Sequence, residues 1–253
     1  MNKTALVTGA TSGIGRATAR ILAKNNYKII LCGRREDRLE LLKNELSEFT
    51  QTHSLLFDVR DKKAVFEKIN SLPAEFSKID LLINNAGNAH GLDPIQNGNL
   101  DDWDAMIDIN VKGLLYVSRA IIPQMIERKS GHIINIGSTA AKEVYPNGNV
   151  YCATKHAVDA LSKSMKMDLN PYGIRVGAIH PGMVETEFSE VRFKGDKEKA
   201  ANVYKGFQPL QPEDIADIIL FVVSRPYHIN ISDLVVMATA QASAVIVNRK
   251  TSF

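Results

Sequence analysis

A tyrosine and a lysine four residues apart form the first pair in this sequence whose types and spacing could do chemistry. Tyr151 and Lys155 fall in the run Y-C-A-T-K, so on a helix their side chains lie one turn apart on the same face. A phenol with its ordinary pKa of ~10 is a poor base at neutral pH. An ammonium about 4–5 Å away favours the phenolate by roughly 3–4 kcal/mol. We therefore expect the lysine to lower the pKa of Tyr151 and make it a proton carrier.

Tyr-x-x-x-Lys pairs also arise by chance, so this pair needs support from its surroundings. Ser138 lies thirteen residues before Tyr151, just after an apolar run that is typical of a strand. A serine hydroxyl there could hold a substrate oxygen while the tyrosine exchanges a proton with it. Taken alone, the Tyr–Lys pair would be structural.

A glycine-rich segment follows the first apolar run and precedes a helical one. It reads T-G-A-T-S-G-I-G over residues 8–15. Such a turn lets backbone N–H groups approach a pyrophosphate at a helix N-terminus, so it predicts a dinucleotide site, although a tight turn alone also needs glycine. No Lys-Ser or Lys-Thr follows, which excludes a P-loop NTPase. The candidate contacts are Gly9, Thr11, Ser12, Gly13, Ile14 and Gly15.

The second strand ends C-G-R-R, where an NAD site would place an acidic residue for the ribose 2′-hydroxyl. The guanidinium groups of Arg34 and Arg35 can instead clasp a 2′-phosphate, so the sequence favours NADP. Two alternatives stay open: the arginines are solvated charges, or Glu36 or Asp37 supplies the acid. We expect Asp37 to cap the following helix.

Alternating strand and helix patterns must position these residues. Nearly continuous β-branched runs are typical of parallel strands covered on both faces, and longer amphipathic runs lie between them. The alternation predicts an α/β fold with a doubly wound parallel sheet. The expected strands are Lys3–Val7, Lys28–Cys32, Ser54–Phe57, Ile79–Ile83, His132–Ile136, Ile174–Ile179 and Asp233–Met237.

Two apolar stripes at helical spacing are expected to lie against this sheet. Their members are Leu39, Leu42, Leu46 and Phe49 in one, and Val158, Leu161 and Met165 in the other. No linker or repeat interrupts the chain, so we expect one domain over residues 1–253. The only strongly charged irregular stretch is Val191–Lys199.

Composition narrows the class of protein. The 253 residues are 45% apolar and 23% charged with a net charge of +3, which argues against a disordered chain and against a nucleic-acid partner. No apolar run reaches the ~18 residues of a membrane span. Cys32 and Cys152 cannot form a disulfide framework, and the six histidines show no metal-ligand spacing. We expect a cytoplasmic protein without a metal.

The order of the motifs is more specific than any one of them. The glycine loop is followed by N-N-A-G at 84–87, Asn110, Ser138, Tyr151, Lys155 and Pro-Gly at 181–182. In this order the chain resembles the short-chain dehydrogenase/reductase family over essentially its whole length. The resemblance implies a single Rossmann-type domain with seven parallel strands, with Ser138, Tyr151 and Lys155 as catalytic residues. It also implies that Asn110 holds a water in the proton relay.

The same resemblance implies the remaining cofactor contacts and the assembly. Asp58 and Val59 would touch the adenine, while Asn84 and Gly87 would brace the central sheet and border the ribose. Subunits of this family usually pair their long helices, which implies a homotetramer. The further residues that the resemblance assigns to the cofactor are Asn85, Tyr151, Lys155, Pro181, Gly182, Val184 and Thr186.

Within the family the chain is most similar to the NADP-dependent 3-hydroxy acid dehydrogenases, which act on serine, allo-threonine or malonic semialdehyde. This similarity rests on the segments 132–140, 147–151, 187–196 and 227–234. A carboxylate substrate needs a cation, and Arg192 and then Lys194 are the candidates in a charged substrate loop at about 185–210. The alternatives are a reductase of 3-oxoacyl thioesters or generic ketones, and a non-catalytic dinucleotide sensor.

Overall fold

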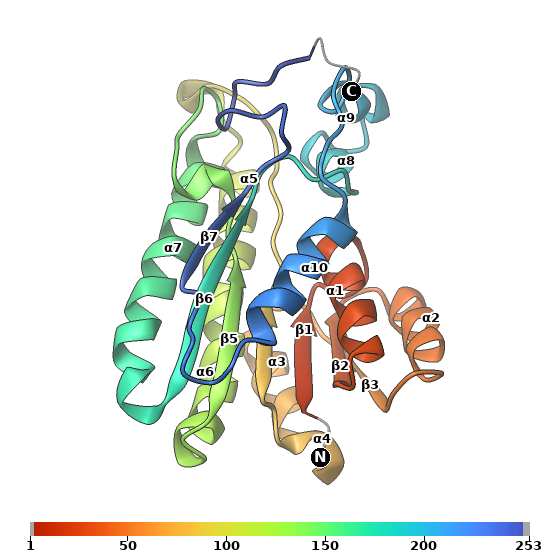
Figure 1. The fold of residues 1–253 in the computed structure, drawn as a ribbon. Helices are drawn as coiled ribbons and strands as arrows, with labels where there is room; N and C mark the ends of the chain where they lie inside the picture. Colours follow the sequence, from red (N-terminus) through yellow and green to blue (C-terminus); the bar gives the residue numbers. More distant parts are fainter. Residues whose placement is uncertain (1–2, 250–253) are drawn as a thin grey trace.

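Seven parallel strands form one sheet in the computed structural model, which describes residues 3–249 (Figure 1). The strand order is β3-β2-β1-β4-β5-β6-β7, so the chain winds outward from β1 in both directions. The strands are β1 (Thr4–Thr8), β2 (Lys28–Gly33), β3 (Thr52–Leu56), β4 (Leu81–Asn84), β5 (Gly131–Ile136), β6 (Ile174–Pro181) and β7 (Asp233–Val236). The predicted doubly wound α/β fold is confirmed.

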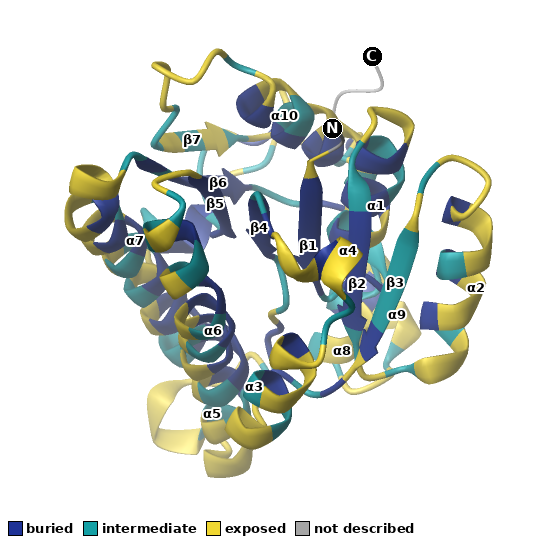
Figure 2. Ribbon diagram, turned by 90° about the horizontal axis from the view of Figure 1, so that it is seen from below, coloured by how far each residue is buried: buried dark blue, intermediate teal, exposed yellow. Residues whose placement is uncertain are grey.

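Helices cover both faces of the sheet because successive strand residues point to opposite sides. In β1, Ala5 and Val7 belong to one apolar cluster and Leu6 to the other. Figure 2 shows the buried strands between the two helical layers. One layer contains α1 (Gly13–Lys24), α2 (Glu36–Leu46) and α10 (Pro212–Val223). The opposite layer contains α3 (Lys62–Asn70), α6 (Leu114–Glu127) and α7 (Asn149–Leu169).

Shorter elements complete the connections. A π-helical turn at Asp108–Gly113 joins α5 (Leu100–Ile107) to α6, and a 3₁₀ turn at Thr139–Ala141 follows β5. Within the described residues, none of the helices is long and apolar enough to cross a membrane. The remaining helices are α4 (Ala74–Ser77), α5 (Leu100–Ile107), α8 (Phe188–Arg192) and α9 (Lys197–Asn202), with 3₁₀ turns at Ile95–Asn97 and Asn170–Tyr172.

All seven predicted strands lie within two residues of the observed ones. The stripe at Val158, Leu161 and Met165 packs inward from α7, as predicted. The prediction for the stripe on α2 is wrong at its last residue, because the helix ends at Leu46 and Phe49 is 50% exposed.

The expected cap of α2 is also wrong. The helix begins two residues earlier than the prediction required, so Asp37 lies inside its first turn. Arg35 occupies the N-cap position and makes no capping side-chain bond there. An acidic residue in the first turn still complements the helix dipole, which accounts for the residue type.

Buried amides join the central strands to the helices behind them. Asn84 at the end of β4 donates to Ser118 of α6 and to Asn135 of β5, each at 2.9 Å. Asn135 in turn donates to Ser162 of α7 at 2.9 Å. This chain of bonds agrees with the bracing role expected for Asn84, and it fixes α7 against the strand that leads to Ser138.

Candidate active site

A cleft of about 600 Å³ opens at the carboxyl ends of the strands, around the point where the chain changes direction between β1 and β4. Open parallel sheets bind ligands at this position. Nineteen of the predicted site residues line it: Gly9, Thr11, Ser12, Gly13, Ile14, Arg34, Arg35, Asp58, Val59, Asn85, Gly87, Ser138, Tyr151, Lys155, Pro181, Gly182, Val184, Thr186 and Arg192.

The glycine loop has the backbone geometry of a phosphate cradle. Gly9 and Gly13 have φ values of +65° and +49°, a region that residues with a Cβ rarely adopt. A Cβ on Gly9 would lie 2.9 Å from the Asn85 amide nitrogen. The N-cap residue of α1, Ser12, makes no capping side-chain bond, so its side chain does not compete with an anion for the first amides of the helix.

Gly15 does not line the cleft, and its predicted cofactor contact stays a prediction. It lies in the first turn of α1, and a Cβ there would collide with the Asn85 side chain and the Gly9 carbonyl. Gly15 therefore permits the close approach of helix and loop that shapes the cradle.

The end of β2 carries the cationic corner of the cleft. Arg35 donates to Thr11 Oγ1 and Ser12 Oγ, each at 2.9 Å from Nη2. Its Nη1 pairs with Glu187, at the start of α8, at 2.9 Å. Arg34 is more exposed and lies 3.7 Å from an Asp58 oxygen. Arg35, rather than Arg34, is thus the guanidinium held against the glycine loop.

Sequence reasoning missed two members of this corner. Arg38 Nη1 pairs with Glu187 Oε1 at 2.6 Å, so one carboxylate bridges two arginines. Helical spacing could have revealed Arg38, because it lies three residues after Arg35 and therefore on the same side of α2. Glu187 had no such signal, since only the fold brings α8 to the end of β2.

Ser138, Tyr151 and Lys155 meet on the opposite wall. Ser138 begins the 3₁₀ turn after β5, and its Oγ accepts a bond from Ala140 N at 3.1 Å. Tyr151 and Lys155 project from the first turns of α7 and are 8% and 6% exposed. Lys155 Nζ donates to Ile136 O at 3.0 Å and lies 5.9 Å from the centre of the tyrosine ring.

Burial governs the ionisation of this pair. It raises the pKa of Tyr151 above its ordinary value, while a hydrogen bond from Ser138 and the charge of Arg192 act in the opposite direction. Burial also lowers the pKa of Lys155 to about 8. The predicted lowering of the tyrosine pKa by Lys155 is therefore wrong for the protein by itself, because desolvation exceeds the neighbouring charges.

Asn110 does not line the cleft, being 2% exposed within the π-helical turn. Its Oδ1 accepts from Asn88 N and its Nδ2 donates to Asn88 O, both at 2.8 Å. The same Nδ2 donates to Thr154 Oγ1 at 3.0 Å, next to Lys155 on α7. Asn110 thus ties the loop after β4 to α7, and π-helical turns often occur at functional sites. Its predicted bond to a water stays a prediction.

The segment that follows β6 is held in place by a glutamine that the sequence did not reveal. Gln241 is 5% exposed, and its Oε1 accepts from Met183 N at 2.9 Å. A Cβ on Gly182 would collide with this amide. The glutamine therefore fixes the segment that carries Val184 and Thr186 into the cleft.

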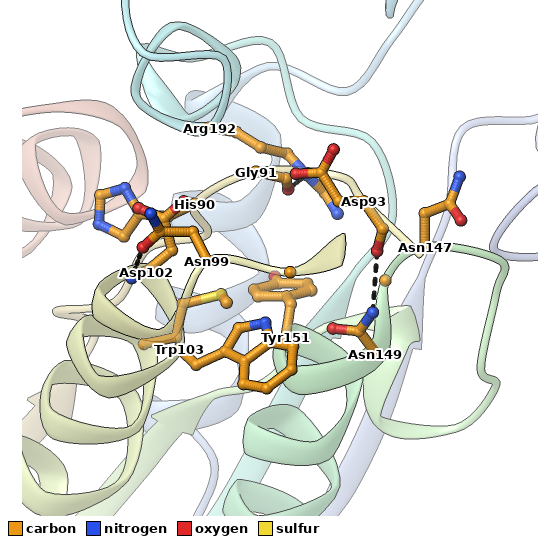
Figure 3. Close-up of a pocket in the computed structure, with 13 residues that line it drawn as sticks. His90, Gly91, Asp93, Asn99, Asp102, Trp103, Asn147, Asn149, Tyr151 and Arg192 are labelled. Carbon is orange, nitrogen blue, oxygen red and sulfur yellow. Dashed lines mark hydrogen bonds between the residues drawn. The ribbon is translucent and has the colours of Figure 1, made fainter. Parts of the chain in front are cut away.

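Arg192 extends from α8 toward Tyr151, as Figure 3 shows. Its guanidinium carbon lies 5.4 Å from the centre of the Tyr151 ring and 5.6 Å from that of Tyr145. Its Nη2 donates to Tyr145 OH at 3.1 Å and its Nε to Gly91 O at 3.3 Å. A small side pocket shares Arg192 and Tyr151 with the main cleft.

Lys194 is not placed like Arg192. It does not line the cleft, and its ammonium pairs with Asp102 at 2.9 Å. This existing carboxylate partner favours Arg192 over Lys194 as the anion clamp.

The fold and the wall formed by Ser138, Tyr151 and Lys155 define a class of protein. A comparison with family models identifies the same class. Residues 3–197 match the model of the short chain dehydrogenases, and the chain belongs to that family. The members of this family to which it is similar include the NADP-dependent 3-hydroxy acid dehydrogenase YdfG of Salmonella typhi. That protein is 48% identical over 240 residues, which cover 94% of this chain and 96% of the relative.

Two further proteins are similar to this chain. Sulfoacetaldehyde reductase 2 of Chromohalobacter salexigens is 44% identical over 98% of this chain and 100% of its own length. A solved structure, the closed form of serine dehydrogenase complexed with NADP+, superposes with a TM-score of 0.92. It is 46% identical and covers 95% of this chain and 97% of its own.

Proposed function

We propose that the protein is an NADP-dependent oxidoreductase that interconverts the 3-hydroxyl and 3-oxo groups of small 3-hydroxy acids. The observation that carries the proposal is the wall of the cleft on which Ser138, Tyr151 and Lys155 meet, with the Arg192 guanidinium over the tyrosine ring. The relatives named for 3-hydroxy acid, serine and sulfoacetaldehyde chemistry support it.

The donor set of the cleft fits NADP. The glycine loop and the start of α1 would take the pyrophosphate, and Arg35 with Arg34 would take the 2′-phosphate. Asp58 and Val59 would border the adenine, and Val184 and Thr186 the nicotinamide amide. When bound, the cofactor supplies or accepts the hydride.

The protein's own residues handle the oxygen and its proton. Ser138 Oγ holds the substrate oxygen, and the Tyr151 hydroxyl gives a proton to that oxygen in reduction or takes one from it in oxidation. Lys155 stabilises the phenolate that reduction leaves behind, because its positive charge lies one turn away. Asn110 orders the backbone behind this pair and connects it to a water.

Arg192 is the proposed partner of the substrate's acidic group. Its two tyrosine contacts aim the guanidinium at the reacting end of the cleft. A planar guanidinium binds a carboxylate through two parallel bonds and accepts a sulfonate by the same chemistry. The names of the relatives have an anionic substrate in common, which agrees with a cation here.

A substrate panel tests the proposal. Serine, 3-hydroxypropionate and 3-hydroxyisobutyrate would be assayed with NADP+ and NAD+ side by side, next to neutral alcohols. We expect turnover with a 3-hydroxy acid and a preference for NADP+. In the reverse direction, turnover restricted to 3-oxoacyl thioesters would identify an acyl reductase, and cofactor binding without any turnover would identify a sensor. A clear preference for NAD+ would contradict the role given to the arginines.

We also propose a homotetramer. Leu100 and Ile107 of α5 and Leu115 of α6 are 67%, 38% and 37% exposed, and an apolar helix face of this kind suits pairing between subunits. Light scattering should give four times the chain mass of 27.9 kDa. A monomer mass at micromolar concentration would refute the tetramer without affecting the proposed chemistry.

A further inference from the structure

A buried histidine packs against the backbone that carries Ser138. His180 lies near the carboxyl end of β6, and its side chain is fully buried. The imidazole fills the space next to Gly137, where a Cβ would collide with the ring. Glycine at 137 therefore lets the ring touch the main chain between Ile136 and Ser138.

The imidazole also forms a hydrogen bond to that main chain. His180 Nδ1 lies 3.3 Å from Ser138 O. A carbonyl oxygen can only accept, so the proton of this bond must be on Nδ1. The neighbouring carbonyl, Ile136 O, accepts the bond from Lys155. The short segment 136–138 thus presents the serine hydroxyl, anchors the lysine and rests on the imidazole.

The other edge of the ring faces two carboxylates. His180 Nε2 lies 3.3 Å from an oxygen of Asp233 on β7 and 3.6 Å from one of Asp159 on α7. Lys142, from the loop after Ser138, bridges the same carboxylates at 2.6 and 2.9 Å. The charged groups that face the ring are therefore Asp159, Asp233 and Lys142. Lys163 contributes a second ammonium group, 2.6 Å from Asp159.

Histidine and aspartate are also metal-ligating residue types, and these three side chains lie close enough to share an ion. The Lys142 ammonium already supplies the positive charge between the carboxylates, however. Lys142, Asp159 and Asp233 therefore form an ionic clamp that joins the loop after Ser138 (the serine loop) to α7 and β7, and His180 Nε2 makes no hydrogen bond to it.

We propose that His180, through its bond to Ser138 O, is a positioning residue for Ser138 that fixes the serine hydroxyl relative to Tyr151. The inference rests on the proposed function, in which Ser138 holds the substrate oxygen. Asp159 lies eight residues after Tyr151 on α7, so the clamp ties the serine loop to the helix that carries the tyrosine. Burial lowers the pKa of His180, which agrees with a neutral ring whose proton is on Nδ1.

Two substitutions separate the hydrogen bond from the bulk of the ring. His180→Leu removes the donor, whereas His180→Asn keeps an N–H near the position of Nδ1. With the best alcohol of the panel, we expect His180→Leu to lower kcat by about tenfold and to leave KM within about twofold. His180→Asn should stay within about threefold of the wild-type kcat.

His132 provides the matched control. It is a buried histidine on the adjacent strand β5, but at the opposite end of the sheet. His132→Leu should therefore leave kcat unchanged at pH 7.5. NADPH binding, followed by its fluorescence, should be equal in all variants, because His180 does not line the cofactor cleft.

Three results would overturn the inference. Full turnover by His180→Leu would show that the bond is not needed. Equal losses in His180→Leu and His180→Asn would show that an N–H at this position does not restore turnover. A similar loss in His132→Leu would show a general effect of removing a buried imidazole. Absence of turnover by the wild type would instead refute the proposed function, and this inference with it.

Discussion

At the residue scale, burial keeps the phenol of Tyr151 in the form that can donate a proton. Its raised pKa keeps it protonated at neutral pH, which is the form that donates a proton to a carbonyl oxygen. Lys155, with its pKa lowered to about 8, is mostly charged below that pH and can stabilise the phenolate that forms. The pair is therefore set as an acid for reduction.

This state of the pair predicts different pH profiles for the two directions. Between pH 6 and 7, kcat/KM for reduction should be flat, because the phenol is protonated and Lys155 is charged, and it should fall as the pH passes about 8, where Lys155 loses its proton. Over the same range kcat/KM for oxidation should rise by up to about tenfold per pH unit, because the phenolate fraction does. Initial rates in both directions would measure this. An oxidation rate that is already level at pH 7 would mean that the phenol pKa lies lower in the complex.

Removing the hydroxyl is the control for these profiles. Tyr151→Phe keeps the ring and its packing against Phe188, whose centre lies 5.6 Å away. It should lower kcat by about a hundredfold or more in both directions. Wild-type rates in this variant would remove the tyrosine from the mechanism.

Arg192 gives a second prediction at this scale. Arg192→Ala should lower kcat/KM for a 3-hydroxy acid by about a hundredfold, because a charge-assisted bond to the carboxylate is lost. A neutral alcohol of similar size should lose much less. Comparing the two substrates separates a carboxylate clamp from a packing role, in which both would fall equally. Lys194→Ala, which lies outside the cleft, should affect neither.

At the scale of elements, the first strand, glycine loop and first helix form one packed unit. Gly15 allows α1 to approach the loop and the Asn85 side chain, which donates to Thr8 O at 2.9 Å. The loop geometry therefore depends on the close approach of Gly15 to the Asn85 side chain.

This packing predicts that Gly15→Ala is harmful although the residue is outside the cleft. The added methyl group must displace Asn85 or the Gly9 carbonyl, which we expect to cost about 1–3 kcal/mol of unfolding free energy. NADPH should bind more weakly because the cradle shifts. Denaturant unfolding and NADPH fluorescence would measure both effects. Unchanged stability together with weaker binding would instead support the direct cofactor contact predicted for Gly15.

At the scale of the whole molecule, stability at low pH depends on histidines buried in the neutral form. His132 is 4% exposed, and burial lowers its pKa to about 3. The unfolded chain takes up a proton near pH 6.5, whereas the folded protein does not until about pH 3. The contribution to stability is therefore complete above pH 6.5, and it is lost progressively as the pH falls toward 3.

Replacing this histidine should make the fold less sensitive to acid. Between pH 7.5 and 5.5, the free energy of unfolding of His132→Leu should fall by about 1 kcal/mol less than that of the wild type. Urea unfolding at the two pH values would show it. A parallel decrease in both proteins would mean that His132 is protonated in the folded state.

The sequence by itself determined the fold class and most of the cleft. Strand positions follow from short β-branched runs, and the site residues follow strands whose carboxyl ends must meet at one edge of a parallel sheet. Tyr151 and Lys155 were predictable as neighbours because helical periodicity is a local rule. Local rules of this kind need no knowledge of what packs against each element.

Only the tertiary structure decided which side chains were desolvated and which distant charges met. Three features depend on segments that are far apart in the chain. They are the balance of burial and charge at Tyr151, the pairing of Glu187 with Arg35 and Arg38, and the clamp beside His180. The physical reason is that desolvation and ion pairing depend on three-dimensional neighbours, and no periodicity along the chain encodes those.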